Sequence, residues 1–277
     1  MNSLSSSEGW RLAAFCAVLA GMLLWELLVP RRVQSIKRTA RWPSNIAVVV
    51  IDTLLVRLVF PIGTIALALV AETNGWGLFN ALRLPQWLTV PAGIILLDLA
   101  IYLQHVLFHW VPALWRFHRM HHADLEFDVT TGVRFHPVEI LLSMAIKLGL
   151  ILSLGTPALA VLGFEVLLSA TSLFNHGNVR LPERADRALR WLIVTPDMHR
   201  VHHSIVTRET NSNFGFNLPW WDWLFKTYRD QPAAGHLGMT IGIEQFREVA
   251  EQRLDRMLTQ PFRAGAQHNP GQRQPAE

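Results

Sequence analysis

The stretch DLAIYLQHVLFHW (98–110) closes an apolar segment and brings two histidines to its end. The whole segment, residues 87–110, is long enough to cross about 30 Å of hydrocarbon as a helix. Asp98, Tyr102, His105 and His109 recur within it at helical spacing, so they share one helical face. Ionisable groups inside a membrane segment are costly and indicate a functional site by default. The pattern therefore predicts a membrane helix that carries a polar stripe toward one end.

Three further apolar stretches accompany this helix. Residues 10–29 and 46–71 precede it, and we expect one membrane span in each. A secretory signal at 10–29 is disfavoured because no basic region precedes the stretch and no small-residue cleavage site follows it. Residues 138–173 are too long for one crossing, and the Gly-Thr-Pro break at 155–157 predicts a hairpin of two helices. The sequence thus predicts an all-α protein with several membrane spans.

The composition is typical of a membrane protein, except for its many histidines. Hydrophobic residues make up 51% of the chain and charged residues only 17%, against about 25% charged in soluble domains. A single cysteine excludes an internal disulfide framework and any zinc or iron–sulfur site built on CxxC. Twelve histidines remain to be explained.

The basic residues predict the orientation of the chain. The net charge is +4, but the pattern is not that of a nucleic-acid-binding surface. A basic cluster directly follows the first apolar stretch, as is typical of the cytoplasmic flank of a membrane helix: Arg31, Arg32, Lys37, Arg38 and Arg41. Counting spans from there predicts that residues 111–137 and 174–277 are cytoplasmic and that the N-terminus lies on the far side. The histidines between 105 and 203 then all fall at or beyond cytoplasmic span ends.

Three histidine clusters have the spacing of metal ligands. An HxxxH pair ends the third span, HRMHH (118–122) lies in the expected loop after it, and HRVHH (199–203) follows the hairpin. Residues three or four apart on a helix share a face, so we expect each cluster to present its imidazoles together. Eight ligands are too many for one ion and suit two metals, for which Fe, Cu, Zn and Ni all qualify. The eight are His105, His109, His118, His121, His122, His199, His202 and His203.

The remaining histidines receive different predictions. His176, in FNHGN just after the hairpin, is expected to be a ligand rather than a supporting residue. For His136, in RFHPVE, we expect the reverse, since Pro137 starts the next helix. His236 and His268 are expected to be ordinary surface residues.

Metal-bound imidazoles usually donate their second N–H to a carboxylate or carbonyl. We expect Asp98 either to serve the metals through a neighbouring residue or to staple two helices, and Tyr102 to line the floor of the metal site. The stretch LPWWDWLFKTY (218–228) is either an aromatic belt at the headgroups or packing beneath the metals. The other candidate partners are Asp124, Glu126, Asp128, Glu139, Asn175, Asp197 and Asn213.

Together these motifs resemble those of the fatty acid hydroxylase/sterol desaturase superfamily of integral-membrane, non-haem di-iron oxygenases. The resemblance covers roughly residues 88–244, through DLAIYLQHVLFH, LWRFHRMHH, RFHPVE, FNHGN, PDMHRVHH and PWWDWLFKTY. It implies four or five transmembrane helices capped by a cytosolic helical catalytic lobe. It also implies two iron ions and O2-dependent hydroxylation or desaturation of a lipid. The eight clustered histidines match the family's ligands, and His176 matches its additional histidine.

The chain is expected to divide into three parts. The apolar pattern predicts an N-terminal membrane region with two spans in residues 1–86, the resemblance implies a catalytic region in residues 87–261, and the composition of residues 262–277 predicts a disordered tail. The lipid would reach the site from the bilayer, and sterol, fatty acyl, carotenoid and ether-lipid substrates all remain open. The chain has no GxGxxG fingerprint and no cysteine set, so electrons must come from a separate reductase or small redox carrier.

Two rival functions also remain open at this point. A transition-metal transporter or storage protein would place its ligands along a path at mid-membrane depth, whereas these ligands crowd one side. A zinc-dependent membrane hydrolase would need a general base and an open three-ligand site, for which eight histidines are a poor fit.

Overall fold

The computed structural model describes residues 2–263, and within this range the chain is helical without any strand. The expected all-α class is therefore confirmed. The expected tail lies outside the described residues from position 264 on, as does His268. The helices are α1 (Asn2–Leu28), α2 (Arg38–Val59), α3 (Thr64–Thr73), α4 (Leu78–Ala81), α5 (Gln86–Trp110), α6 (Pro112–His122), α7 (Pro137–Leu154), α8 (Ala158–Asn175), α9 (Glu183–Leu189), α10 (Pro196–His202), α11 (Thr207–Thr210), α12 (Trp220–Leu224), α13 (Gly235–Gly238) and α14 (Leu254–Thr259). Three short 3₁₀ helices complete them: Thr131–Val133, Val249–Gln252 and Gln260–Phe262.

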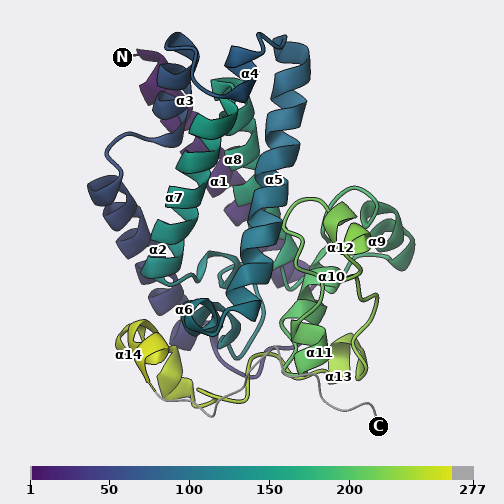
Figure 1. Ribbon diagram of the computed structural model, residues 1–277. Coiled ribbons are helices and arrows are strands. Elements are labelled where there is room, and N and C mark those ends of the chain that lie inside the picture. Colours follow the sequence, from purple (N-terminus) through teal and green to yellow (C-terminus); the bar gives the residue numbers. More distant parts are fainter. Residues whose placement is uncertain (1, 264–277) are drawn as a thin grey trace.

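Within residues 2–263, five segments are long and apolar enough to cross a membrane. They form a bundle in which α1 and α5 both pack on α8, while α2 packs on α7 (Figure 1). The shorter helices α6, α10, α11, α13 and α14 gather around one end of the bundle, where α5 ends. The segments are Gly9–Leu28, Arg38–Ala81, Gln86–Trp110, Pro137–Leu154 and Ala158–Asn175.

The second span differs from the continuous crossing expected at 46–71. Its helix starts earlier, at Arg38, and stops at Val59 before α3 resumes at Thr64. Pro61 explains the break, because proline has no N–H to donate and disfavours helical geometry in the residue before it. Phe60 accordingly has non-helical backbone angles (φ −121°, ψ 75°). The second crossing is therefore a pair of helices joined by a short non-helical segment.

The hairpin expected within 138–173 is confirmed, with its break at the expected place. Helix α7 ends where Gly155 adopts a left-handed conformation with φ 67°. That conformation is costly for any residue with a Cβ atom. A side chain at this position would also meet the carbonyl oxygen of Trp76 at 2.4 Å. Pro157 then precedes the first residue of α8, so the chain reverses direction within a few residues.

A buried ionic cluster joins α2 to the segment that follows α6. The Arg41 guanidinium donates to both carboxylate oxygens of Asp124, at 2.6 and 2.7 Å, and to Asp128 at 2.7 Å. All three side chains are fully buried. The sequence placed Arg41 only in a basic membrane flank. In the structure it fixes the position of the chain between the histidines of α6 and the start of α7.

Candidate metal centre

Nine histidines converge at the end of α5 and form two separate groups. In each group the ring nitrogens that face one another lie within 4.8 Å of one another, and every side chain is buried. One group comprises His105, His109, His118, His122 and His202, and the other comprises His121, His176, His199 and His203.

The two HxxHH motifs divide between the groups in a reciprocal way. HRMHH on α6 gives His118 and His122 to the five-histidine group and His121 to the other. HRVHH, which comprises the last four residues of α10 and the residue after it, gives His199 and His203 to the four-histidine group and His202 to the first.

The expectations of a loop position for HRMHH and of one shared face for each triplet are therefore wrong. Neighbouring helix positions differ by about 100°, so the third and fourth residues after a histidine point in different directions. Each motif thus supplies an i, i+4 pair to one group and its middle histidine to the other.

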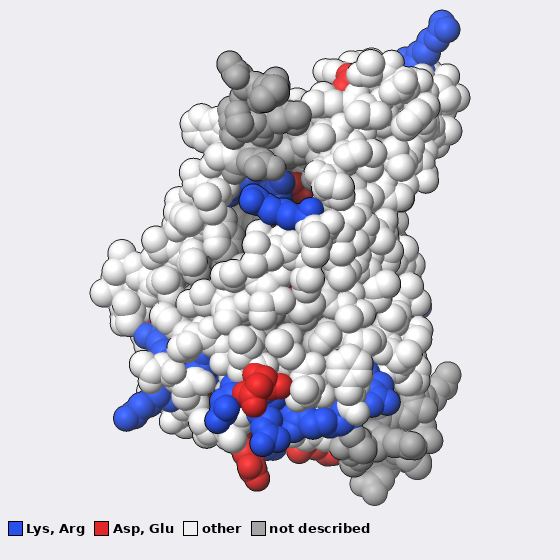
Figure 2. Space-filling model, turned by 90° about the vertical axis from the view of Figure 1, so that its left-hand side faces the viewer, with Lys and Arg blue, Asp and Glu red and all other residues white. Residues whose placement is uncertain are grey.

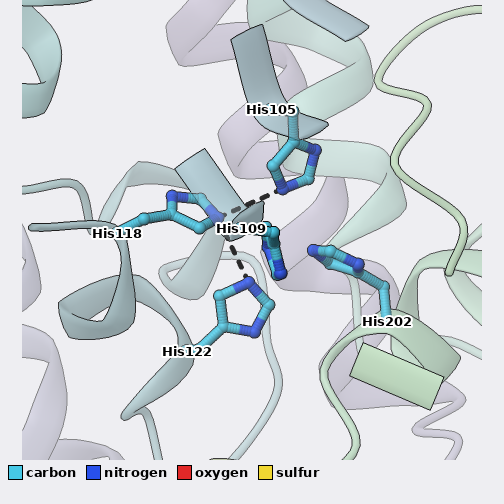
Figure 3. Close-up of side chains that lie close together, drawn as sticks. All are labelled: His105, His109, His118, His122 and His202. Carbon is cyan, nitrogen blue, oxygen red and sulfur yellow. Dashed lines mark hydrogen bonds between the residues drawn. The ribbon is translucent and has the colours of Figure 1, made fainter. Parts of the chain in front are cut away.

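The five-histidine group draws its rings from three helices (Figure 3). His105 and His109 come from α5, His118 and His122 from α6, and His202 from α10, with the rings turned toward a common centre. The Nε2 atom of His118 lies 3.1 Å from that of His105 and 3.2 Å from that of His122.

The four-histidine group is assembled in the same manner around His176. Its Nε2 atom lies 3.2 Å from Nε2 of His121 and 3.0 Å from Nε2 of His199. His176 directly follows α8, so the end of the hairpin brings this ring to the residues of α6 and α10. Sequence reasoning favoured His176 as a ligand, and it lies in this group.

The outer nitrogens of most rings are held by oxygen atoms. Nδ1 of His105 lies 2.8 Å from the carbonyl oxygen of Phe214. Nδ1 of His202 lies 2.7 Å from the carbonyl oxygen of Ser212, and Nδ1 of His176 lies 2.8 Å from that of Ser172. A carbonyl only accepts, so Nδ1 carries the proton and Nε2 keeps a free lone pair toward the group's centre. His118, His109 and His121 follow the same pattern, with oxygens of Glu139, Asn211 and Arg134.

Burial keeps these rings neutral. It lowers the pKa of both His118 and His176 to about 3. Burial, together with the neighbouring imidazoles, also lowers the pKa of His121, His199 and His203 well below the usual value. Neutral imidazole is the form that ligates a metal. Nε2 of His109, His202 and His203 has no hydrogen-bond partner among the described residues, although each atom is buried.

Among the described residues, Glu139 is the one expected supporting residue whose side chain hydrogen-bonds to a clustered histidine. Its Oε1 accepts from Nδ1 of His118 at 2.7 Å. Asn175 donates instead to the Phe216 carbonyl, and Asp197 pairs with Arg31 and Arg200. His136 caps α7, its Nδ1 accepting from the backbone N–H of Val138.

The polar stripe of α5 divides into two parts. Asp98 accepts from the Trp221 indole at 2.8 Å and from the backbone N–H of Leu218 at 3.3 Å. The Tyr102 hydroxyl bonds to Thr227, and its ring stacks on Phe225 at 5.4 Å. The prediction that Tyr102 lines the floor of the metal site is therefore wrong. Of the two roles left open for Asp98, the staple is the one observed, since it fastens α5 to the tryptophan-rich segment.

The other residues expected to support the histidines bond to other parts of the chain. Asp124 and Asp128 belong to the Arg41 cluster, and Glu126 accepts from the backbone of Ser35 and Ile36. Asn213 donates to the carbonyls of Met198 and Arg229. His236 was expected on the surface, but it is buried with Nε2 3.5 Å from Asp197.

Sequence reasoning missed the segment that orients two of the rings. The carboxylate of Asp222 accepts from the backbone N–H groups of Phe214 and Gly215 at 2.8 and 2.9 Å. It thereby fixes the backbone whose carbonyl holds His105. Burial raises the pKa of Asp222 to about 6. The only signal in the sequence was the position of Asp222 within the tryptophan-rich stretch.

A cavity of about 620 Å³ adjoins the five-histidine group. His105, His118 and Glu139 form part of its lining, together with Phe60 and Gly63 from the break between α2 and α3. Most of its wall is apolar, supplied by α1, α2, α5, α7 and α8. The cavity therefore connects the histidines with the membrane-spanning part of the bundle.

Comparison with known proteins agrees with this arrangement. Residues 90–227 match the fatty acid hydroxylase family. The chain is 29% identical over 238 residues to ornithine lipid hydroxylase OlsE of Rhizobium tropici, covering 83% of this chain and 71% of the relative. It is 25% identical over 187 residues to the alkylglycerol monooxygenase of Xenopus tropicalis, covering 64% of this chain but 39% of that protein.

A third relative is fatty acid hydroxylase vlmA of Lecanicillium sp, 25% identical over 52% of this chain and 43% of its own length. No solved structure matches the chain significantly.

The relatives lend no support to a metal transporter or a zinc hydrolase. The matched region contains all nine clustered histidines. The chain belongs to the fatty acid hydroxylase/sterol desaturase superfamily and is a membrane-bound oxidoreductase that acts on lipids.

Proposed function

We propose that the chain hydroxylates a membrane lipid with O2 at a pair of iron ions, one in each histidine group. The observation that carries the proposal is the inward set of Nε2 lone pairs, several of them buried without a partner. Leaving such atoms unpaired is costly, and a metal in each group would satisfy them. The proposed ligands are the nine clustered histidines, His176 included.

The donor set fits iron in both groups. Imidazole suits Fe as well as Zn, Cu and Ni, so the choice among metals follows from the family rather than from the ligands. Five histidines would hold one iron and four the other, and O2 would bind beside them. The bound irons would supply the oxidising power that an unactivated C–H bond requires.

The reaction must balance in atoms and electrons. One C–H bond of the lipid is replaced by C–OH, O2 provides that oxygen, and its second atom leaves as water. Two electrons and two protons are consumed, and we propose that a separate reductase or small redox carrier delivers the electrons. Desaturation would use the same oxidant and electrons but would remove two hydrogens from the lipid instead.

The chain's own residues position the reaction. Glu139 and the carbonyls of Phe214 and Ser212 hold the rings of His118, His105 and His202. The apolar cavity beside them would admit a lipid from the bilayer and keep bulk water away from the reacting carbon. We also propose that residues 87–261 form the catalytic region and that residues 1–86 form an N-terminal membrane region.

We propose further that the histidine end of the bundle faces the cytoplasm, as the basic residues at 31–41 suggest. A reporter fused after the last residue would then be active on the cytoplasmic side. Reporter activity on the far side would contradict this orientation without affecting the proposed reaction.

Comparative lipid mass spectrometry of cells tests the proposed activity. Cells that express the chain should contain a lipid heavier by one oxygen than in cells that lack it, and His202→Ala should abolish this product. His136→Asn is the matched control, because asparagine also caps helices and His136 lies outside both groups. An unchanged lipid profile, or full product from His202→Ala, would contradict the proposal.

A further inference from the structure

A charged cluster interrupts the apolar band of the bundle. Figure 2 shows a broad band without charged side chains and, within it, a hollow in which basic side chains gather. The cavity lining includes Arg11 from α1, Arg57 from α2 and Glu165 from α8. Charged residues at membrane depth are rare and mark functional pathways by default.

Glu165 organises this cluster but does not neutralise it. Its carboxylate, 4% exposed, lies 3.0 Å from Arg11 and 3.1 Å from Lys147. It also accepts from the Thr64 hydroxyl at 2.9 Å. Two cations thus share one carboxylate inside a low-dielectric region, where an uncompensated charge is expensive.

The charged side chains away from the histidines carry more positive than negative charge. Arg11 and Arg57 line the cavity together with the carboxylates of Asp52 and Glu165, and Lys147 shares Glu165 with Arg11, so these five side chains comprise three cations and two carboxylates. The third carboxylate of the lining, Glu139, bonds to His118 at the histidine end. Guanidinium groups suit carboxylate and phosphate oxygens, which they bind through paired, charge-assisted hydrogen bonds. The side chain of Arg11 remains 39% exposed despite its ion pair, so one side of it is accessible.

The same cavity continues from this cluster to the histidines. Between the two lie apolar side chains, among them Phe15, Val56, Ile101 and Leu168. Ser172 and His105 complete the lining on the histidine side. A polar group at one end, an apolar wall and a candidate metal group at the other end match the shape of an amphiphile.

We propose that Arg11 and Arg57 bind the anionic group, a carboxylate or a phosphate, of an amphiphilic substrate whose apolar chain extends toward the histidines. This inference rests on the proposed function and names the substrate class for it. Arg11 and Arg57 act as specificity residues that set the position of the substrate.

The proposal fixes where oxidation occurs. Glu165 and His176 are eleven positions apart on or next to α8, which corresponds to about 16 Å at ~1.5 Å per residue. The charged end and the metal end of the cavity therefore stand at a set distance. When the length of the substrate chain changes, the oxidised carbon should stay constant as counted from the anionic group, not from the methyl end.

Equilibrium binding to the full-length, metal-bearing protein in detergent tests the inference. The probes are hexadecyl phosphate, hexadecanoic acid and hexadecanol, which share one chain and differ in the head. We expect both anions to bind about tenfold or more tighter than the alcohol, as charge-assisted hydrogen bonds predict. Inorganic phosphate at the same concentration should not displace hexadecyl phosphate, because the apolar wall supplies part of the affinity.

Substitutions of Arg11 and Arg57 are compared with a substitution of an arginine outside the cavity. Arg57→Gln and Arg11→Gln should each remove most of the preference for the anions and leave hexadecanol binding unchanged. Arg57→Lys should retain much of it, and Arg187→Gln, an exposed arginine on α9, should behave as the wild type. Equal binding of anions and alcohol to the wild type, or an unchanged preference in both glutamine variants, would overturn the inference. Displacement by equimolar inorganic phosphate would overturn the claim that the site takes an amphiphile.

The result is separable from the proposed function. If cells still accumulate the oxidised lipid while anions and alcohol bind equally, only the assignment of Arg11 and Arg57 fails. If no lipid is oxidised at all, the proposed function fails whatever the probes bind.

Discussion

The carboxylate of Glu139 accepts a hydrogen bond of 2.7 Å from Nδ1 of His118, and both side chains are buried. The bond fixes the tautomer of His118 and turns its Nε2 toward the five-histidine group. Removing such a partner typically weakens metal affinity about 10–100-fold. We expect Glu139→Ala to lose metal in this range and Glu139→Gln, which keeps an acceptor, to lose less. Metal retained against a chelator measures the difference.

Glu248→Gln is the control for this experiment, since Glu248 is exposed and far along the chain from the histidines. Equal metal retention in Glu139→Ala and wild type would show that the hydrogen bond does not support a metal ligand.

The division of the histidines into two groups predicts the metal count. We expect close to two irons per chain in protein purified with its metal retained. His109→Ala and His203→Ala each remove a nitrogen from a different group, so each should lower the count toward one. The double variant should fall below either single variant. Elemental analysis per mole of protein tests this, and a single variant that keeps both metals would refute the assignment of its group.

The bonds from Asp98 to Trp221 and Leu218 predict a loss of stability rather than a loss of metal. A buried hydrogen bond left without its partner costs about 1–3 kcal/mol. We expect Asp98→Ala to lower the melting temperature while the iron content and the turnover per bound iron stay normal. Asp255→Ala, at an exposed position on α14, provides the control. Normal melting with depleted iron would instead assign Asp98 to the metal centre.

Arg41 predicts a larger loss of stability. Arg41→Met would leave the buried carboxylates of Asp124 and Asp128 without their main cation, and breaking a buried ion pair costs about 3–5 kcal/mol. We expect early unfolding of this variant in a denaturant titration in detergent, whereas Arg187→Met should match the wild type. A near-normal midpoint for Arg41→Met would show that the cluster adds little to stability.

The same cluster has a defined pH dependence. Burial alone would raise the pKa of Asp124 and Asp128, but the Arg41 guanidinium holds both below their ordinary value. A depressed pKa in the folded state contributes stability above the unfolded value of about 3.9, and the contribution is lost as pH falls below it. The stability of the wild type should therefore fall as the pH drops below about 4, and its advantage over Arg41→Met should be smaller there than at neutral pH.

The sequence predicted the membrane helices and the histidines well because both depend on local patterns. Apolar length revealed the spans, and Gly155 and Pro157 marked the hairpin. The number of clustered histidines indicated two metals, but the spacing within HRMHH and HRVHH did not reveal that the motifs exchange their middle histidines. That exchange depends on how α6 and α10 approach each other, which no local pattern encodes.

Long-range polar contacts account for what the sequence did not predict. From the sequence, Arg41 is one of several membrane-flanking cations, and only the fold places it beside Asp124. The carbonyl of Phe214, which orients His105, is a backbone group, so the residue types give no signal of this contact. Tyr102 lies on the expected face of α5, but its hydroxyl bonds to Thr227, which is 125 positions further along the chain.

Oxygen-isotope labelling directly tests whether the protein transfers an oxygen atom from O2 to a lipid. The iron-loaded protein is supplied with a lipid extract from its own cells, a source of electrons and oxygen-18 gas, and the lipids are then analysed by mass spectrometry. We expect one oxygen-18 atom in the product lipid, and no labelled product from His109→Ala or His203→Ala. A product whose new oxygen comes from water, or labelled product formed at the wild-type rate by both variants, would contradict it.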